Sequence, residues 1–177
     1  THQNAPFPGS PFDLEVVPGP ASAITTMVPR GLELRGEVGR EPEHGCQLAL
    51  RSYDFTGNRC VDGGAHVTCT ASDEKVVAKT TDNGDGTYML TWRSERAGRH
   101  TVKVLIDEEE ILGSPFTLEL LPTVPALERT LITGDGLSSG RVGEPAVVNV
   151  KLIDAFENSI GMTDTLRFGL ALVGTDE

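Results

Sequence analysis

The sequence predicts an all-β chain built from tandem two-sheet sandwich repeats. Three observations support this fold class: a short motif that recurs along the chain, apolar residues that alternate with polar ones, and turn-forming segments between the alternating runs. Alternation with a period of two is typical of strands that bury one face. The internal repeat has a length of about 100 residues, which is the size of an immunoglobulin-like sandwich.

The internal repeat is marked by the motif Gly-Ser-Pro-Phe, which occurs at residues 9–12 and again at residues 113–116. The flanking residues recur with the motif, because PFDLEVVP at residues 11–18 aligns with PFTLELLP at residues 115–122. A chance match of four residues would not bring matching flanks with it. The motif and its flanks therefore indicate two copies of one structural unit.

The beginning of the unit is repeated as well. LALRSYD ending at Asp54 aligns with VNVKLID ending at Asp154, and Asn58 aligns with Asn158. We therefore expect neighbouring repeats to contact each other. The predicted organisation is the last strand of one repeat at residues 1–18, a complete repeat at residues 19–122 and the N-terminal half of a following repeat at residues 123–177.

Strands of the complete repeat are predicted in chain order from their alternation, and segments rich in Gly, Asp and Asn separate them. No helix of more than two turns is expected, and Gly86 should allow a tight turn before the strand that contains Tyr88. The alternating runs are residues 46–53, 66–71, 87–92, 101–106 and 116–120, which with both flanking strands makes about seven. The side chains expected to be buried are Tyr88, Leu90, Trp92, Val102, Val104 and Phe116.

Composition narrows the possible partners. The chain has 15 Lys and Arg residues against 26 Asp and Glu residues, for a net charge of −11. Neutralising phosphate groups requires a basic surface. Nucleic acid and an anionic membrane are therefore not expected as main partners. No apolar run is long enough to span a bilayer, so no membrane contact is expected from these residues.

The cysteines and the glycosylation pattern indicate a compartment. Cys46, Cys60 and Cys69 are an odd number of thiols, which makes a poor disulfide framework, and no Asn-x-Ser/Thr acceptor occurs. Both facts favour reduced thiols in the cytoplasm. One disulfide with one free thiol is the alternative.

One acidic cluster resembles part of a calcium loop. Asp82, Asn83 and Asp85 have the spacing of the first ligands of an EF-hand. That loop also requires a Glu at its twelfth position and flanking helices, whereas Arg93 occupies the position and the flanks alternate like strands. We interpret the cluster as a turn between two strands.

No residue set supports catalysis or a cofactor. Cys60, His66 and Cys69 have a spacing seen at metal sites, but zinc sites usually have four ligands. His66 and Cys69 are also three residues apart on one predicted strand, so their side chains should point to opposite faces of the sheet. The histidines are scattered, and no nucleophile elbow, phosphate loop or metalloprotease motif occurs. We predict that the chain is not an enzyme and that it has no cofactor.

The motifs together resemble a known family. TDNGDGTYMLTW at residues 81–92, AGRHTVKV at residues 97–104 and ILGSPFTLEL at residues 111–120 resemble the second half of a filamin-type repeat. GDGL at residues 134–137 followed by VGEPAVVNVKLIDAFEN at residues 142–158 resembles its first two strands. The resemblance implies a tandem array of immunoglobulin-like domains.

The resemblance also implies where a partner protein binds. The third strand of such a repeat has an open edge, which accepts an added strand from the partner; the alternative is an ordinary edge strand in a repeat that serves as a spacer. Main-chain hydrogen bonds give such a complex affinity, and alternate side chains give it specificity. Thr68 and Thr70 are expected to point outward. The site would consist of the third strand and the strand that follows it: His66, Val67, Thr68, Cys69, Thr70, Ala71, Lys75, Val77 and Lys79.

The function expected from this resemblance is a scaffold or spacer that binds proteins and is linked to the cytoskeleton, in the cytoplasm. The alternative is a cell-surface adhesion ectodomain, because filamin-type repeats also occur in gamete-surface proteins. An actin-binding, ubiquitin-ligase or membrane-anchoring domain elsewhere in the protein would distinguish these classes.

Overall fold

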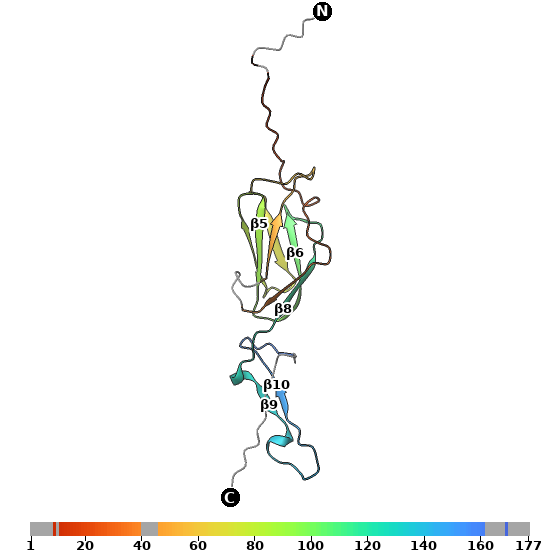
Figure 1. The fold of residues 1–177 in the computed structure, drawn as a ribbon, viewed down its shortest axis with the longest axis vertical. Helices are drawn as coiled ribbons and strands as arrows, with labels where there is room; N and C mark the ends of the chain where they lie inside the picture. The colour runs from red at the N-terminus through yellow and green to blue at the C-terminus, as the bar shows by residue number, and fades with distance from the viewer. Residues whose placement is uncertain (1–8, 10, 40–45, 162–168, 170–177) are drawn as a thin grey trace, which may run out of the picture.

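The computed structural model describes residues 9, 11–39, 46–161 and 169 (Figure 1). In the described part of the chain the regular structure consists of strands and two short 3₁₀ helices. The strands are β1 (Glu33–Glu37), β2 (Cys46–Arg51), β3 (Val67–Ala71), β4 (Val77–Asp82), β5 (Thr87–Arg93), β6 (Gly98–Ile106), β7 (Glu109–Glu110), β8 (Phe116–Leu121), β9 (Leu131–Thr133) and β10 (Asn149–Lys151), and the helices are Leu127–Arg129 and Asp135–Leu137.

Strands β1 to β8 form two sheets. One sheet has the order β1-β8-β6-β3, with β7 paired to β6, and the other has the order β2-β5-β4. All pairs are antiparallel except β1 with β8, which run parallel. The prediction of an all-β sandwich without a long helix is therefore confirmed for the described residues of the span 19–122.

The core lies between the two sheets and consists of side chains that alternate along the strands. β5 contributes Tyr88, Leu90 and Trp92, whose neighbours on the strand are only half-buried or exposed. The Trp92 ring meets the Phe116 ring edge to face, with centroids 5.9 Å apart and planes at 90°. All six side chains predicted to be buried are in this core: Tyr88, Leu90, Trp92, Val102, Val104 and Phe116.

Two differences from the predicted strands can be traced to individual turns. The structure has an additional short strand, β7, because the chain reverses at Asp107 and Glu108, both at positive φ, and pairs again with β6. β4 begins at Val77 rather than at Lys75. The reason is a turn, in which Asp73 accepts hydrogen bonds from the backbone N–H groups of Lys75 and Val76.

The segment at residues 11–18 is extended but belongs to no sheet of the described chain (Figure 1). Its apolar side chains Phe12, Leu14 and Val16 are 75%, 86% and 83% exposed. The residues aligned with them in β8, namely Phe116, Leu118 and Leu120, are buried. The segment thus has the sequence of a core strand without the environment of one.

Residues beyond β8 form a smaller unit, in which β9 and β10 pair antiparallel. Residues 162–168 and 170–177, at the end of the predicted N-terminal half of the following repeat, lie outside the described residues. The described chain contains no helix that is long and apolar enough to cross a membrane.

Candidate protein-binding edge

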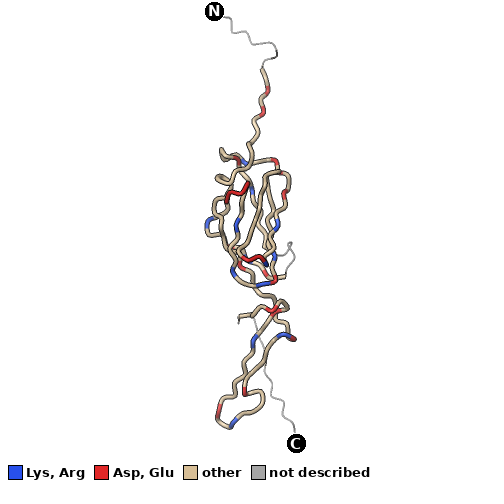
Figure 2. The backbone as a smooth tube through the Cα atoms, turned by 180° about the vertical axis from the view of Figure 1, so that it is seen from behind, with Lys and Arg blue, Asp and Glu red and all other residues tan. Residues whose placement is uncertain are grey.

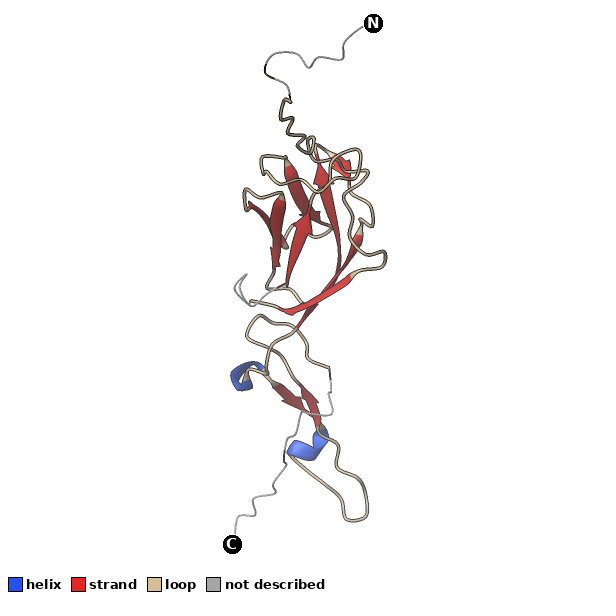
Figure 3. Cartoon of the chain, turned by 45° about the horizontal axis from the view of Figure 1, so that its top comes forward, coloured by secondary structure: helices blue, strands red, loops and turns tan. Residues whose placement is uncertain are grey.

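β3 and β4 are the outer strands of their sheets, which are drawn red in Figure 3, and a side-chain contact places them at the same side of the sandwich. β3 pairs only with β6, and β4 pairs only with β5, among the described residues. The Cys69 sulfur of β3 lies 3.5 Å from the Thr80 hydroxyl oxygen of β4, so the two edges contact each other through side chains. Each strand leaves one row of backbone groups without a partner strand.

The register of β3 decides which residues face outward. The carbonyl of His66 accepts a hydrogen bond of 3.1 Å from the N–H of Asp107, and the N–H of Ser72 donates to the carbonyl of Thr101 at 2.8 Å. Bonded residues alternate in an antiparallel pair. The even-numbered residues of β3 therefore direct their backbone groups to β6, and the odd-numbered residues direct theirs away from it.

The outward-facing residues are thus Val67, Cys69 and Ala71. The N–H of Val67 already donates to the carbonyl of Ala65 at 2.9 Å. The carbonyl of Val67 and both backbone groups of Cys69 and Ala71 remain for another strand. This set of donors and acceptors is the chemical basis of the candidate site.

Side chains of β3 alternate between the core and the outer surface, as predicted. Val67 is buried, and Cys69 and Ala71 are half-buried against the core. Thr70 is exposed, whereas Thr68 is half-buried. An added strand would therefore meet small hydroxyl side chains on the outer face.

The predicted residues of the following strand lie differently. Lys75 is in the turn before β4, and the side chains of Val77 and Lys79 are exposed. Ala78 and Thr80 are half-buried, so they lie on the face of β4 that is directed to the core, and Thr80 contacts Cys69. Thr80 was not among the predicted site residues, because the predicted strand ends at Lys79, whereas β4 continues to Asp82.

Charges around the edge are balanced rather than concentrated. Lys103 of β6 lies beside Thr70 in the sheet, and its ammonium group pairs with Glu110. Acidic and basic residues are interspersed along the backbone of the repeat (Figure 2). The groups of this edge that can bind a partner are therefore mainly its backbone hydrogen-bond donors and acceptors.

The three cysteines are free thiols. Burial raises the pKa of the Cys46 thiol to about 11. Burial also raises the pKa of Cys69, and the hydrogen bond with Thr80 opposes this change only in part. Both thiols are therefore protonated at neutral pH and are poor nucleophiles.

The acidic cluster before β5 is a turn, as predicted. Asp82 accepts hydrogen bonds from the N–H groups of Gly84 and Gly64 at 2.8 and 2.7 Å, and Asp85 accepts one from the N–H of Thr87 at 3.0 Å. The hydrogen bonds from Thr87 lower the pKa of Asp85. The carboxylates thus hold their own loop together. No group of three side chains that could bind a metal occurs among the described residues.

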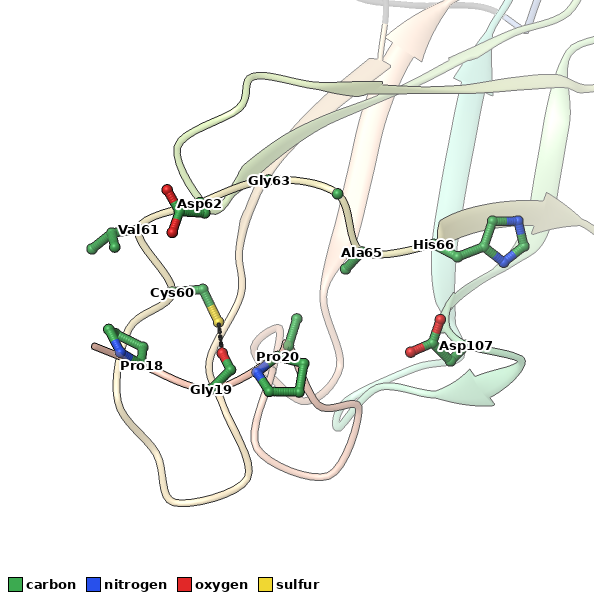
Figure 4. Close-up of a pocket in the computed structure, with 12 residues that line it drawn as sticks. Pro18, Gly19, Pro20, Cys60, Val61, Asp62, Gly63, Ala65, His66 and Asp107 are labelled. Atoms are coloured by element: carbon green, nitrogen blue, oxygen red, sulfur yellow. Dashed lines mark hydrogen bonds between the residues drawn. The ribbon is translucent and has the colours of Figure 1, made fainter. Parts of the chain in front are cut away.

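A hollow of about 440 Å³ lies at the end of the sandwich where the chain enters it (Figure 4). It is lined by residues 18–21, by residues 60–66 and by Asp107. The Cys60 sulfur lies 3.7 Å from the carbonyl oxygen of Gly19, which ties the entering chain to the loop before β3. His66 is at this hollow and is exposed, as predicted.

Two facing sheets with an added parallel pair of first and last strands define an immunoglobulin-like β-sandwich. Its candidate site is a sheet edge and not a catalytic cleft. Comparison with protein families gives a match to the Filamin/ABP280 repeat over residues 29–117, half of the chain. The chain therefore belongs to the filamin-repeat family, whose repeats are structural modules without catalytic function.

Sequence relatives agree with this assignment. Filamin-C of Rattus norvegicus is 30% identical over 158 residues, which cover 89% of this chain and 5% of filamin-C. The E3 ubiquitin-protein ligase TRIM45 of Bos taurus is 36% identical over 70 residues, 37% of this chain and 12% of the ligase. The chain thus spans only a small part of the length of these relatives.

Among solved structures, the Escherichia coli adhesin FdeC has a similar fold. The TM-score is 0.58 at 17% sequence identity, and the match covers 82% of this chain and 45% of that structure. At this level of identity the likeness concerns the fold alone.

Proposed function

We propose that the complete repeat at residues 19–122 is a scaffold or spacer module that binds a protein partner by adding an extended segment of that partner to β3. The observation that supports this proposal most is the outward row of backbone groups on Val67, Cys69 and Ala71. These groups have no partner strand among the described residues. A peptide in β conformation supplies the complementary donors and acceptors at the same spacing.

The side chains around the edge favour an extended partner. One set of its side chains would lie over Thr68 and Thr70, and the alternate set would be directed at Cys69 and Thr80. These residues are small, so the backbone of the partner can approach β3 to the normal strand separation of about 4.8 Å. A helix could not use the row of backbone groups, because its own backbone groups are already paired.

The wider role that we propose is a link to the cytoskeleton in the cytoplasm, with cytoskeletal proteins among the partners. The similarity to filamin-C supports it. The net charge of −11 supports a protein rather than a nucleic acid or an anionic membrane as partner. A cell-surface array is the alternative location, and the likeness to a bacterial adhesin is compatible with it.

The test introduces a charge on the outer face of the edge. Thr70→Asp should leave the fold intact, because the side chain is exposed. It should weaken partner binding by about 1–3 kcal/mol, because the added strand would cover the new carboxylate while the neighbouring Lys103 ammonium is already paired with Glu110. Partners captured from native extract by the unmodified chain provide the ligand, and affinities are then measured with the recovered protein.

Thr101→Asp is the matched control. Thr101 is also exposed, but it lies on β6, an inner strand of the same sheet. The control should bind normally, and the Cys69 and Ala71 amides of the unmodified chain should exchange with solvent more slowly once the partner is bound. Equal affinity of the Thr70 and Thr101 variants, with no change at these amides, would remove β3 as the site.

A further inference from the structure

The smaller unit after β8 contacts the complete repeat through one amide side chain. Asn158 accepts a hydrogen bond from the N–H of Ala97 through Oδ1 and donates one to the carbonyl of Glu95 through Nδ2, both at 2.8 Å. Glu95 and Ala97 lie in the turn between β5 and β6. One side chain thus satisfies both a donor and an acceptor of a turn in the other unit.

An apolar contact lies beside this hydrogen-bonded pair. Phe156 packs against the core of the complete repeat and over Gly39. A Cβ atom on Gly39 would lie 2.1 Å from the Phe156 ring, so the ring requires a glycine at this position. The N–H of Gly39 donates to the carbonyl of Ser94 at 2.9 Å, which joins both contacts to the same turn.

The Asp154 carboxylate holds the two contacting residues in position. It is fully buried and accepts hydrogen bonds from the N–H groups of Phe156 and Asn158 at 2.9 and 2.8 Å. It also accepts one from the N–H of Thr123, at the start of the unit, at 3.1 Å. The turn is therefore rigid before it meets the repeat, which lowers the entropy cost of the contact.

The complete repeat contains the same turn at its opposite end. Asp54 accepts hydrogen bonds from the N–H groups of Thr56, Asn58 and Gly19 at 2.9, 2.8 and 3.0 Å. Among the described residues, however, Asn58 bonds only within its own turn. The two turns thus share their internal bonds and differ in whether a neighbouring unit is present.

We propose that the Asp154–Asn158 turn is the docking surface that fixes one filamin-type repeat against the next. Its partner is the turn between β5 and β6 of the preceding repeat. The Asp54–Asn58 turn presents the amide part of this surface to a repeat that precedes residue 19, but Thr56, which bonds to Asp54, stands where the later turn has Phe156. The exposed apolar segment at residues 11–18, which matches the last strand of the complete repeat, leads from such a unit. The proposal depends on the division into repeats and is independent of binding at β3.

The experiment compares two identical substitutions in the chain of residues 1–177. Asn158→Ala removes the contact and the internal bonds of its turn, whereas Asn58→Ala removes only internal bonds. Hydrogen exchange of the Ala97 amide, followed by NMR, should accelerate by about tenfold or more in the first variant. It should be unchanged in the second. Unchanged exchange at Ala97 in both variants would overturn the proposal.

A second pair of variants leaves the Asp154 turn intact. Gly39→Ala places a methyl group against Phe156. Gly31→Ala is its control, because both glycines have a left-handed backbone, with φ of +67° at Gly39 and +71° at Gly31. A Cβ atom added at Gly31, however, has no other atom within 4 Å. Residual dipolar couplings should fit one common alignment for both units in the unmodified chain and in the Gly31 variant. They should require two alignments in the Gly39 variant. Two alignments already in the unmodified chain would contradict a fixed junction.

Discussion

Gly86 is a residue whose role can be separated into backbone strain and steric contact. Its φ is +75°, and a Cβ atom there would lie 2.1 Å from the carbonyl oxygen of Cys60. The same glycine accepts hydrogen bonds from the backbone N–H and the hydroxyl of Ser52 at 3.0 and 2.9 Å. The turn before β5 therefore depends on a residue without a side chain, as its sequence context predicts.

We expect Gly86→Ala to lower the free energy of unfolding by more than the roughly 1 kcal/mol that a left-handed alanine costs. Gly84→Ala is the control, because its φ is +78° and no atom lies within 4 Å of its added Cβ. Urea unfolding is followed by the fluorescence of Trp92, the single tryptophan of the chain. Equal losses in both variants would show that the Cys60 carbonyl moves away at no cost.

Asp54 should make the repeat sensitive to acid. Hydrogen bonds from the Asn58 side chain and the Gly19 backbone hold its pKa below the ordinary value, so the folded state favours the ionised carboxylate. The stabilisation is present above the unfolded pKa of about 3.9 and is lost as the pH falls below it. The melting temperature followed by Trp92 fluorescence should therefore drop between about pH 4 and pH 2.

Asp54→Asn isolates this carboxylate from the others. The variant should be less stable at pH 7, and its melting temperature should depend less on pH below about 4. Asp154 is a second such group, because hydrogen bonds from Asn158 and the backbone outweigh the effect of burial and lower its pKa. A full acid-induced decline in the Asp54 variant would assign the sensitivity to other groups.

At the scale of the strands, the alternation of apolar residues was enough to predict the core of β5, β6 and β8. The limits of β4 could not be predicted in this way, because they depend on the hydrogen bonds that Asp73 makes in the preceding turn. As a result, Thr80 was missed as the contact of Cys69. The outward row of β3 also required the register with β6, which a single strand sequence does not contain.

Phe116 and Phe12 provide a test of strand context. They occupy the same position of the repeated motif, but Phe116 is 4% exposed in β8 and Phe12 is 75% exposed. Phe116→Ala should lower the free energy of unfolding by about 3–5 kcal/mol, because it removes the ring that packs on Trp92. Phe12→Ala should change it by less than about 0.5 kcal/mol.

Urea unfolding followed by circular dichroism suits this pair, because removing Phe116 would itself alter the fluorescence of Trp92. Comparable losses in the two variants would mean that the segment at residues 11–18 packs against the repeat in solution.

At the scale of the whole chain, the repeat alignment correctly paired Asp54 with Asp154 and Asn58 with Asn158, and the structure shows the same turn at both places. The contact between Asn158 and the β5–β6 turn could not be predicted. It joins a side chain to backbone groups about 60 residues away, which belong to a turn of a different unit. The alternation of apolar and polar residues predicts strands and their buried faces, but it does not predict a contact between a side chain and the backbone of a distant turn.

The parallel pairing of β1 with β8 has a mechanical consequence. The chain enters the repeat at one end and leaves it after Leu121 at the other (Figure 1), and the register joins residues 33–37 to residues 117–121. Tension between the two ends pulls these strands past each other along their length. The hydrogen bonds between the two strands are then loaded in shear, so they bear the force together. We therefore expect the repeat to resist tension until this row of bonds breaks as a unit, and its lifetime under tension to follow the rate of that event.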